Sequence, residues 1–593
     1  MTPRASEAEL KPLIPGPVPC DSQCAIFGNG VKKLSGFAVA VEPRKVKTTK
    51  PSGQPSHPFV AVSIESSPTD GDWLATEKDG SCARHICKMT DATQEKEPAT
   101  APVTSTDDDE MENMSPLKYL VTRIPTLVPP MNPAPNPFKA LALLNKQQWL
   151  FFLVAFFAWS WDAFDFFTVS LTTSELAEEF DKSVSDITWG ITLVLMLRSV
   201  GAITFGIAAD RWGRKWPFVV NNVLFIVLEL GAGFCQTYKQ FLACRALFGI
   251  AMGGLYGNAA ATALEDCPME ARGIVSGLLQ QGYAFGYLLA TAFARGLVGT
   301  TSHGWRPLYW FGACPPVLII IFRLCLPETQ TFQKRQATRA EVTGGVTTSF
   351  LSEGKVAVKR HWLLLVYMVL LMAGFNFMSH GSQDLYPTML ENQFGFSKTE
   401  VTVTQVVANL GALSGGTLCG WASQIFGRRF SIIVVSIVGG AILYPYTFVT
   451  NPRVMAAAYF EQFCVQGAWG VIPIHLMELS PGAIRTFVVG TSYQLGNLVS
   501  SASSTIESTI GERFPLPPTE EGKHRYEYGK VICIFMGCVY AYTIIATFFG
   551  PERLGRNFDV AHDSDMAEVT AHRGMTEGNS GSDAEKGTTQ HGN

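Results

Sequence analysis

Twelve runs of apolar residues, each about long enough to cross a lipid bilayer, restrict this chain to a membrane-spanning helical fold. Backbone amides inside the hydrocarbon core need internal partners, so runs of this kind are predicted to be helices. Only 16% of the 593 residues are charged, which is too few for a typical soluble domain. The approximate runs are 148–170, 185–208, 216–236, 239–260, 273–294, 306–326, 361–385, 400–423, 430–450, 453–475, 486–506 and 529–550.

A polar stretch divides the twelve runs into two sets of six. We therefore predict an all-α membrane protein with two six-helix halves between two tails. The tails are polar and bury too little apolar area to fold, so both are expected to be disordered. The predicted parts are a tail at 1–145, the first half at 146–326, a linker at 327–360, the second half at 361–550 and a tail at 551–593.

Basic residues indicate which side of the membrane each loop faces. Clusters fall at Arg211/Arg214/Lys215, in the linker, and at Arg428/Arg429. All three are cytoplasmic if both termini are cytoplasmic, as the excess of positive charge on that side requires. The bias is modest, because the loop before the last run is also basic. We expect a multi-pass protein with both termini in the cytoplasm.

Two sequence echoes relate the halves to each other. The first pairs Gly206-Ile-Ala-Ala-Asp210-Arg211-Trp-Gly213-Arg214-Lys215 with Gly420-Trp-Ala-Ser-Gln424-Ile-Phe-Gly427-Arg428-Arg429, which lies 214 residues later. The second pairs Glu265, Arg272, Gly277 and Gln281 with Glu478, Arg485, Gly490 and Gln494, which lie 213 residues later. Matching motifs in corresponding places predict two homologous six-helix repeats.

The first of these motifs resembles the signature loop of the major facilitator superfamily, Gly-x-x-x-Asp-Arg-x-Gly-Arg-Lys. The match is complete in the first half, whereas Gln424 replaces the acid in the second. The resemblance covers about residues 145–550 and implies a transporter with twelve helices in two pseudo-repeats. It defines fold and transport better than it defines the solute.

A polar stripe interrupts the seventh run. Asn376, His380 and Asp384 are spaced four residues apart, so a helix places them on one face, with Gln383 beside them. Ionisable groups at membrane depth are unfavourable and usually mark a pathway. Imidazole titrates near physiological pH, so His380 and Asp384 are candidates for proton coupling. The alternative is a hydrogen-bonded pair that only holds the helix.

The same block resembles a narrower group of carriers. Its residues follow the pattern Asn-x-x-Ser/Thr-His-x-Ser/Thr-Gln-Asp-x-x-x-Thr of the fungal Jen family of lactate/pyruvate–proton symporters. Every fixed position is filled, by Asn376, Ser379, His380, Ser382, Gln383, Asp384 and Thr388. The stretch Trp159-Ser-Trp-Asp162-Ala-Phe-Asp165 also resembles this family and the related sialate–proton symporters. The resemblance implies a plasma-membrane permease for short monocarboxylates, coupled to protons.

Three further residues are candidates for the solute site. Arg198 lies in the second run and needs an anionic partner. That partner is either Asp162 or Asp165 of the first run, or the carboxylate of a solute held in bidentate fashion. The Jen resemblance favours the carboxylate of the solute as the partner of Arg198. Gln494 and Asn497 share a face of the eleventh run, where they either join helices or, as the family pattern implies, contact solute.

Most of the other charged residues are expected to act in gating, and two acids have no single expected role. Asp210, Arg211 and Arg214 lie at a helix end, and we expect them to form state-dependent ion pairs. Similar pairs are predicted for Glu265, Arg272, Glu478 and Arg485. Glu229 and Glu461 are intramembrane acids that fit either a proton relay or simple packing.

Several functional classes are disfavoured by the sequence. We find no nucleophile–base motif, phosphate loop or metal set, and Cys82, His85 and Cys87 match no zinc spacing, so no enzyme, cofactor or metal is expected. A net charge of −4 gives no sign of nucleic-acid binding. The expected partners are a small monocarboxylate, a proton, the bilayer, and regulatory or trafficking proteins at the tails. The alternatives are a symporter of a dicarboxylate or sialic acid, and a nutrient receptor with the same fold.

Overall fold

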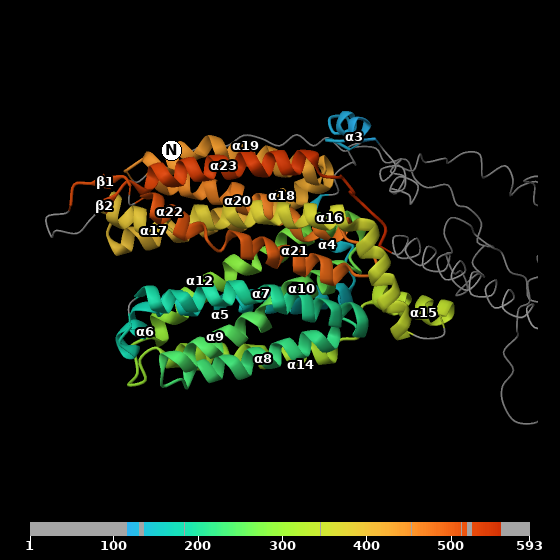
Figure 1. The fold of residues 1–593 in the computed structure, drawn as a ribbon, viewed down its shortest axis with the longest axis horizontal. Coiled ribbons are helices and arrows are strands. Elements are labelled where there is room, and N and C mark those ends of the chain that lie inside the picture. The colour runs from blue at the N-terminus through green and yellow to red at the C-terminus, as the bar shows by residue number, and fades with distance from the viewer. Residues whose placement is uncertain are drawn as a thin grey trace, which may run out of the picture. The chain divides into compact units, whose positions relative to one another are not determined.

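The computed structural model describes residues 115–129, 136–182, 184–343, 346–451, 453–511, 513–518 and 525–558. These residues belong to one compact unit that spans 97–593. Nearly all ordered elements are helices, so the predicted all-helical fold is confirmed (Figure 1). The described strands are β1 (Pro515–Leu516) and β2 (Arg525–Tyr526), which pair antiparallel in one loop.

The helices before the linker pack together and form the first half. They are α5 (Lys146–Leu171), α6 (Thr173–Phe180), α7 (Val184–Trp212), α8 (Lys215–Gly233), α9 (Tyr238–Gly253), α10 (Leu255–Leu264), the short η1 (Met269–Ala271), α11 (Arg272–Gln280), α12 (Gly282–Leu297), α13 (Arg306–Gly312) and α14 (Cys314–Cys325). The linker contains α15 (Gln330–Thr343).

The helices after the linker form the second half, which Figure 1 shows in yellow to red. They are α16 (Val346–Gln383), α17 (Tyr386–Thr388), the π-helical η2 (Met389–Gln393), α18 (Lys398–Phe426), α19 (Arg428–Phe448), α20 (Val454–Leu479), α21 (Arg485–Ser500), α22 (Ser503–Gly511) and α23 (Tyr528–Phe549). Helix α16 bends at His361, where the backbone leaves helical geometry. The halves meet where α7 packs against α21 and α11 packs against α18.

Within the described residues, eight helical stretches are long and apolar enough to cross a membrane. They coincide with eight of the twelve predicted runs. The remaining runs, 273–294, 400–423, 453–475 and 486–506, are also helical, but their helices are shorter or less apolar. Helix α20, for example, buries Glu461, Gln462 and Gln466. The count of twelve spanning helices stays a prediction.

Local sequence signals account for several helix ends. Asn145 and Ser397 each form a capping box with the residue three positions on, which starts α5 and α18. Gly213 and Gly427 adopt φ values of 95° and 92°, a region that favours glycine. They stop α7 and α18 at equivalent places in the two echoing motifs, so the next helix can begin at once.

Glycines bring pairs of helices into close backbone contact. A side chain at Gly201 or Gly253 would collide with the backbone carbonyl of Ile250 or Arg198, respectively, so α7 and α9 touch directly. In the second half, Gly415 packs in the same way against the carbonyl of Phe463 between α18 and α20. Small residues are the usual means of close helix packing in membranes. The contact fixes the backbone that carries Arg198.

The first predicted tail contains two short helices, α3 (Pro116–Thr122) and α4 (Pro137–Ala142). Each begins with a polar cap, Ser115 or Asn136, followed by proline at the first helical position. These local signals are strong enough to start a helix in a segment whose composition predicted disorder. Most of the remaining N-terminal tail lies outside the described residues.

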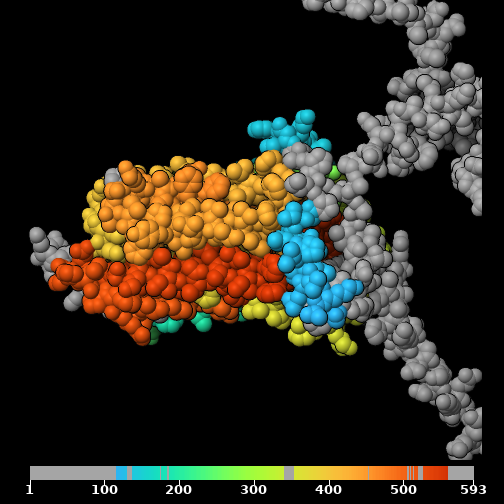
Figure 2. Space-filling model, turned by 90° about the horizontal axis from the view of Figure 1, so that it is seen from above, coloured from blue at the N-terminus to red at the C-terminus, as the bar shows by residue number. Residues whose placement is uncertain are grey.

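Segment 115–129 is held against the ends of α19 and α23, where Figure 2 shows it in blue beside the orange and red helices. Tyr119 donates its hydroxyl to the carbonyl of Phe549 at 2.9 Å, and Arg123 donates to the carbonyl of Gly550 at 2.8 Å. Arg429 in turn donates to the carbonyl of Thr126 at 3.4 Å. The first two contacts are to backbone carbonyls at the end of α23, which lack partners within the helix.

The C-terminal segment 551–558, which we predicted as part of a disordered tail, is also ordered. Phe558 is only 2% exposed and lies between two guanidinium groups, with Arg272 at 3.9 Å and Arg485 at 4.2 Å from its ring centroid. Arg272 belongs to α11 in the first half and Arg485 to α21 in the second. The segment therefore links the two halves at one end of the molecule. The remaining residues of this tail, 559–593, lie outside the described part.

Candidate functional site

The polar stripe of α16 is assembled as its spacing predicts. His380 Nδ1 lies 3.1 Å from an oxygen of Asp384, and His380 Nε2 lies 3.2 Å from Oδ1 of Asn497 on α21. The side chains of His380 and Asp384 are 18% and 33% exposed. The imidazole therefore joins two helices while both titratable groups stay accessible to solvent.

Side-chain amides around His380 and Asp384 form further hydrogen bonds, some on α21 and one to α20. The Asn497 amide donates to Oε1 of Gln494 at 3.4 Å, and Asn376 donates to the carbonyl of Tyr493 at 3.4 Å. The first contact lies within α21, and the second ties α16 to α21. Gln383 instead donates to Oε1 of Gln462 on α20 at 2.9 Å. Gln383 thus contributes to a neighbouring contact rather than to the hydrogen bonds around His380.

Arg198 lies on α7 of the opposite half and is almost completely buried. Its guanidinium is 4.0 Å from a carboxylate oxygen of Asp162 and lies over the ring of Phe166 at 4.8 Å. A separation of 4.0 Å is too long for a hydrogen bond, and Nε of Arg198 has no hydrogen-bond partner among the described residues. The predicted pairing with Asp162 is present but loose, which leaves donors on the guanidinium.

Arg198 and the stripe face the same region between the halves. Ser199, next to Arg198, donates its hydroxyl to the carbonyl of Gln494 at 3.2 Å. Arg198 is also close enough to His380 for the two groups to interact electrostatically. Of the seven predicted solute residues, six therefore gather where α7, α16 and α21 meet, and Gln383 lies at the edge.

Aromatic rings from both halves form one wall of this region. Tyr256 on α10 stacks on Tyr493 on α21 at 4.2 Å between ring centroids. Trp159 on α5 and Trp469 on α20 contact Tyr493 edge-on at 6.1 and 5.6 Å. These rings were not predicted as site residues, because aromatic residues in a spanning run are not distinguishable from lipid-facing or packing residues.

Several buried acids surround the site. Glu229 pairs with Arg245 at 3.1 Å, and Glu461 accepts a hydrogen bond from Tyr540 at 2.7 Å. Neither oxygen of Asp165 has a hydrogen-bond partner among the described residues, and the same is true of Glu507 on α22. Glu507 is fully buried and interacts electrostatically with Asp384. Sequence reasoning missed it, because Glu507 lies just beyond the predicted run 486–506.

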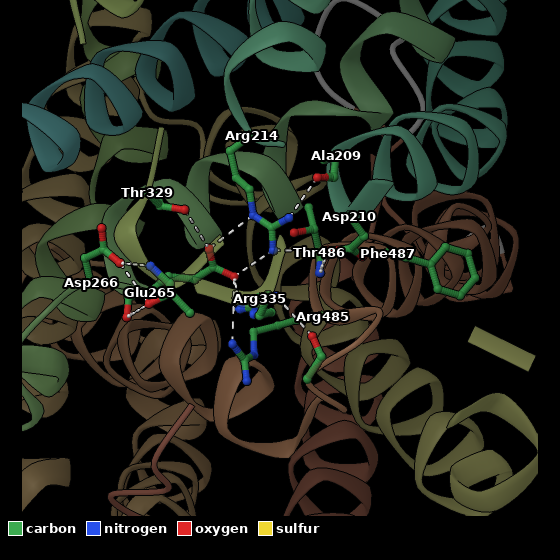
Figure 3. A network of polar contacts seen from close by, with 12 residues as sticks. Ala209, Asp210, Arg214, Glu265, Asp266, Thr329, Arg335, Arg485, Thr486 and Phe487 are labelled. Carbon is green, nitrogen blue, oxygen red and sulfur yellow. Dashed lines mark hydrogen bonds and ion pairs between the residues drawn. The ribbon is translucent and has the colours of Figure 1, made fainter. Parts of the chain in front are cut away.

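A second polar cluster closes the end of the molecule that carries the basic motifs (Figure 3). Arg214 binds Glu265 with two hydrogen bonds, of 3.1 and 2.7 Å, and pairs with Asp210 at 3.1 Å. Asp210 accepts the backbone N–H groups of Thr486 and Phe487 at the start of α21. The acid of the first half thus holds a helix end of the second half.

Glu265 is the centre of this cluster. Besides Arg214 it contacts Arg335 of the linker helix at 2.8 Å and Arg485 of α21 at 3.8 Å. Burial alone would raise the pKa of Glu265, but the three arginines outweigh it and lower the pKa to about 2. The carboxylate is therefore ionised at every pH that a cell meets.

The second motif has a related arrangement without the acid. Arg428 binds Glu478 at 2.9 and 3.1 Å, and it donates to Oε1 of Gln424, the residue that replaces aspartate. Two of the residues predicted for ion pairs lie elsewhere. Arg272 donates to the backbone carbonyls of Cys267 and Arg556. Arg211 forms no ion pair with an acid among the described residues, and its guanidinium lies 5.0 Å from the ring centroid of Trp212.

Comparison with families of known proteins gives a match over most of the chain. A family model described as "Sugar (and other) transporter" matches residues 145–563. The carboxylic acid transporter protein homolog of Saccharomyces cerevisiae is 40% identical over 437 residues, which cover 71% of each chain. The cis,cis-muconate transport protein of Acinetobacter baylyi is 28% identical over 373 residues, or 62% of this chain and 88% of its own.

Among solved structures, the proton:xylose symporter XylE of the major facilitator superfamily has a TM-score of 0.57 with this chain. The alignment covers 70% of this chain and 98% of XylE at 18% sequence identity. At that identity the similarity establishes the major facilitator fold and nothing about the solute.

Proposed function

Because the chain belongs to the sugar (and other) transporter family, we propose that it is a plasma-membrane symporter that carries a short monocarboxylate together with a proton. Lactate, pyruvate and acetate are the solutes of this class that we favour. The 40% identical yeast relative, named as a carboxylic acid transporter homolog, supports an organic acid as the solute. The Jen-type block from Asn376 to Thr388 supports the narrower choice.

The observation that carries the proposal is the His380–Asp384 pair facing Arg198 across the two halves. In the proposed mechanism Arg198 binds the solute carboxylate, because its guanidinium has donors that Asp162 does not use. His380 and Asp384 take up the coupling proton. Asn376, Gln383, Gln494 and Asn497 then contact the hydroxyl or keto oxygen of the solute.

The charges in the region support a solute with one carboxylate rather than two. Arg245, the other arginine of this half near the site, is held by Glu229 at 3.1 Å. Arg198 pairs with its own acid, Asp162, only at 4.0 Å, so its guanidinium is the more available of the two for a solute carboxylate. A dicarboxylate would place its second charge among Asp162, Asp165 and Asp384, which would repel it. The similarity to a muconate transport protein makes a dicarboxylate the alternative to test.

Symport follows from the membrane potential. A carboxylate that enters alone moves against an inside-negative potential, at about 2.3 kcal/mol per charge per 100 mV. A proton that enters with it cancels this unfavourable term. The titratable pair in α16 is accessible, so it can load a proton on one side of the membrane and release it on the other.

The arrangement fits a carrier that is closed at the basic end. Asp210, Arg214 and Glu265 hold α21 and the linker there, whereas Asp384 is partly exposed toward the opposite end of α16. We propose that rocking of the halves breaks the cluster around Glu265 and exposes the site to the cytoplasm. Asp210 and Arg214 are gating residues in this scheme, and Arg211 is not.

Uptake of radiolabelled lactate in a yeast strain without its own permeases tests the proposal. Uptake should rise as external pH falls and should collapse with a protonophore. Uptake that is indifferent to both treatments would exclude proton coupling. Excess unlabelled succinate or sialic acid that competes as well as pyruvate would favour the alternative solutes. A protein that reaches the surface and gives no net uptake in vesicles would support a receptor.

A further inference from the structure

A cavity of about 580 Å³ lies on the outer surface of the first half, away from the solute site. It is formed between α7 and α8, close to the loop that contains the basic motif. Its lining is apolar apart from one hydroxyl, and consists of Thr204, Phe205, Ala208, Trp212, Trp216, Pro217 and Val220. That hydroxyl, of Thr204, already donates to the carbonyls of Val200 and Gly201. The cavity therefore suits an apolar occupant.

The surroundings of the cavity identify the medium that it faces. Exposed apolar side chains continue from it along both helices, including Val200, Ile203 and Ile207 on α7 and Val223 and Val227 on α8. In a membrane-spanning chain such a surface lies against lipid acyl chains. Trp212 and Trp216 flank the cavity at the helix ends, and each is 60% exposed. Tryptophan is enriched at this depth, where the acyl chains meet the head groups.

A positive charge stands at the rim. Of the three basic residues in the loop, Arg214 is engaged by Asp210 and Glu265, and Lys215 donates its ammonium to the carbonyls of Leu324 and Leu326. Arg211 has no ion pair with an acid in the described part of the chain, and its guanidinium lies over Trp212. It is partly exposed, so it can contact a group that sits above the cavity.

We propose that this cavity binds an anionic phospholipid of the cytoplasmic leaflet, with an acyl chain between Trp212 and Trp216 and the head-group phosphate against Arg211. Basic residues beside clefts between spanning helices are suited to anionic head groups, and the cytoplasmic leaflet is rich in such lipids. The site needs both parts, because the cavity offers no polar partner and Arg211 alone is a single exposed charge. The proposal requires the loop to be cytoplasmic but does not depend on which solute is carried.

Tryptophan quenching tests the acyl-chain part. The full-length protein is reconstituted in phosphatidylcholine that contains a minor fraction of brominated phosphatidylserine or, separately, brominated phosphatidylcholine. The brominated anionic lipid should quench more strongly at equal fraction. The excess should vanish in a Trp212→Phe/Trp216→Phe variant and persist in a Trp189→Phe/Trp362→Phe control, which removes two similarly exposed tryptophans elsewhere. No excess in the wild type, or an excess kept in the first variant, would overturn the proposal.

Variants at the rim test the head-group part. Arg211→Gln should reduce the preference for the anionic over the zwitterionic lipid about fivefold, the factor that corresponds to about 1 kcal/mol per basic residue near an anionic surface. Arg211→Lys should keep most of it. An unchanged preference in Arg211→Gln would remove the arginine from the site. Inorganic phosphate should not abolish the excess quenching; if it does, the site binds a free anion rather than a lipid.

Discussion

At the scale of single residues, His380 is held at both ring nitrogens, by Asp384 on its own helix and by Asn497 on α21. A proton on the imidazole is therefore stabilised by the Asp384 carboxylate. The hydrogen bond to Asn497 links the protonation state of His380 to α21. In the proposed mechanism Asp384 is the residue whose charge matters most for coupling, because it is the ionisable partner of His380 and its side chain is 33% exposed.

Asp384→Asn should nearly abolish proton-driven uptake while the protein still reaches the cell surface. The amide keeps the shape and the contact with His380 but removes the charge that favours the imidazolium. Uptake of labelled lactate and surface biotinylation on the same cells would show this. Glu391→Gln, which removes an exposed acid from η2 a short distance along the chain, should transport normally. Wild-type uptake in Asp384→Asn would assign Asp384 a purely structural role.

Arg198→Lys should weaken lactate affinity about ten- to hundredfold, although the charge is kept. A guanidinium holds a carboxylate with two parallel hydrogen bonds, and the loss of one charge-assisted bond corresponds to about 1.5–3 kcal/mol. Concentration-dependent uptake measures the effect, with Arg295→Lys on the exposed surface of α12 as a neutral control. If Arg198 only neutralises Asp162, lysine will replace it with little change in affinity.

Sequence spacing was sufficient to place the stripe, because Asn376, His380 and Asp384 are one helical turn apart and a helix must align them. It could not show that Gln383 turns toward Gln462, since two residues of different helices decide that contact. Glu507 was missed for the same reason. Its position beside Asp384 depends on how α22 packs against α16, which no local pattern records.

At the scale of elements, the cluster around Glu265 joins the loop after α7, the end of α10, the linker helix α15 and the start of α21. The sequence predicted ion pairs from the two echoing motifs. The linker arginine was not foreseen in this role, because Arg335 lies in a polar stretch with many basic residues and no distinguishing motif. The pairing of Arg335 with Glu265 depends on the linker folding as the helix α15, which no local pattern around Arg335 predicts.

Glu265→Gln should slow transport but leave its pH dependence unchanged. The folded-state pKa of Glu265 is lowered to about 2 from its usual value of 4.5, so its ion pairs are fully formed above pH 4.5. Their contribution is lost only as the pH falls toward about 2. Uptake measured between about pH 5 and pH 7, above the range in which these ion pairs are lost, should therefore keep its profile. A flattened profile would place proton sensing in this cluster.

At the scale of the whole molecule, the halves are joined at one end by the Glu265 cluster and by Phe558 between Arg272 and Arg485. A ring between two cations from different halves has to leave at least one of them when the halves separate. Each cation–π contact contributes about 0.5–2 kcal/mol, depending on how far it is desolvated. The C-terminal segment therefore stabilises the closed arrangement.

Phe558→Ala should raise the equilibrium constant for opening of the closed end about fivefold or more, if the lost cation–π contacts stabilise the closed state by about 1 kcal/mol. Cys267 is a natural probe, because it is buried at that end and burial raises the pKa of its thiol to about 12. Its labelling by a membrane-impermeant maleimide in inside-out vesicles should accelerate in the variant, with Cys267→Ser to identify the labelled site. Phe549→Ala, at an exposed ring outside the sandwich, should label at the wild-type rate. An unchanged rate in Phe558→Ala would exclude the stabilising role.

The docking of segment 115–129 has a consequence for the order of events during synthesis of the protein. Tyr119 and Arg123 bind the carbonyls of Phe549 and Gly550, which follow them by 430 and 427 residues. A ribosome that adds about 5–20 residues per second needs about 20–90 s to make that stretch. During this interval the carbonyls of Phe549 and Gly550 do not yet exist, so these two contacts can form only after α23 has been made. Its attachment thus distinguishes a finished carrier from one still under synthesis.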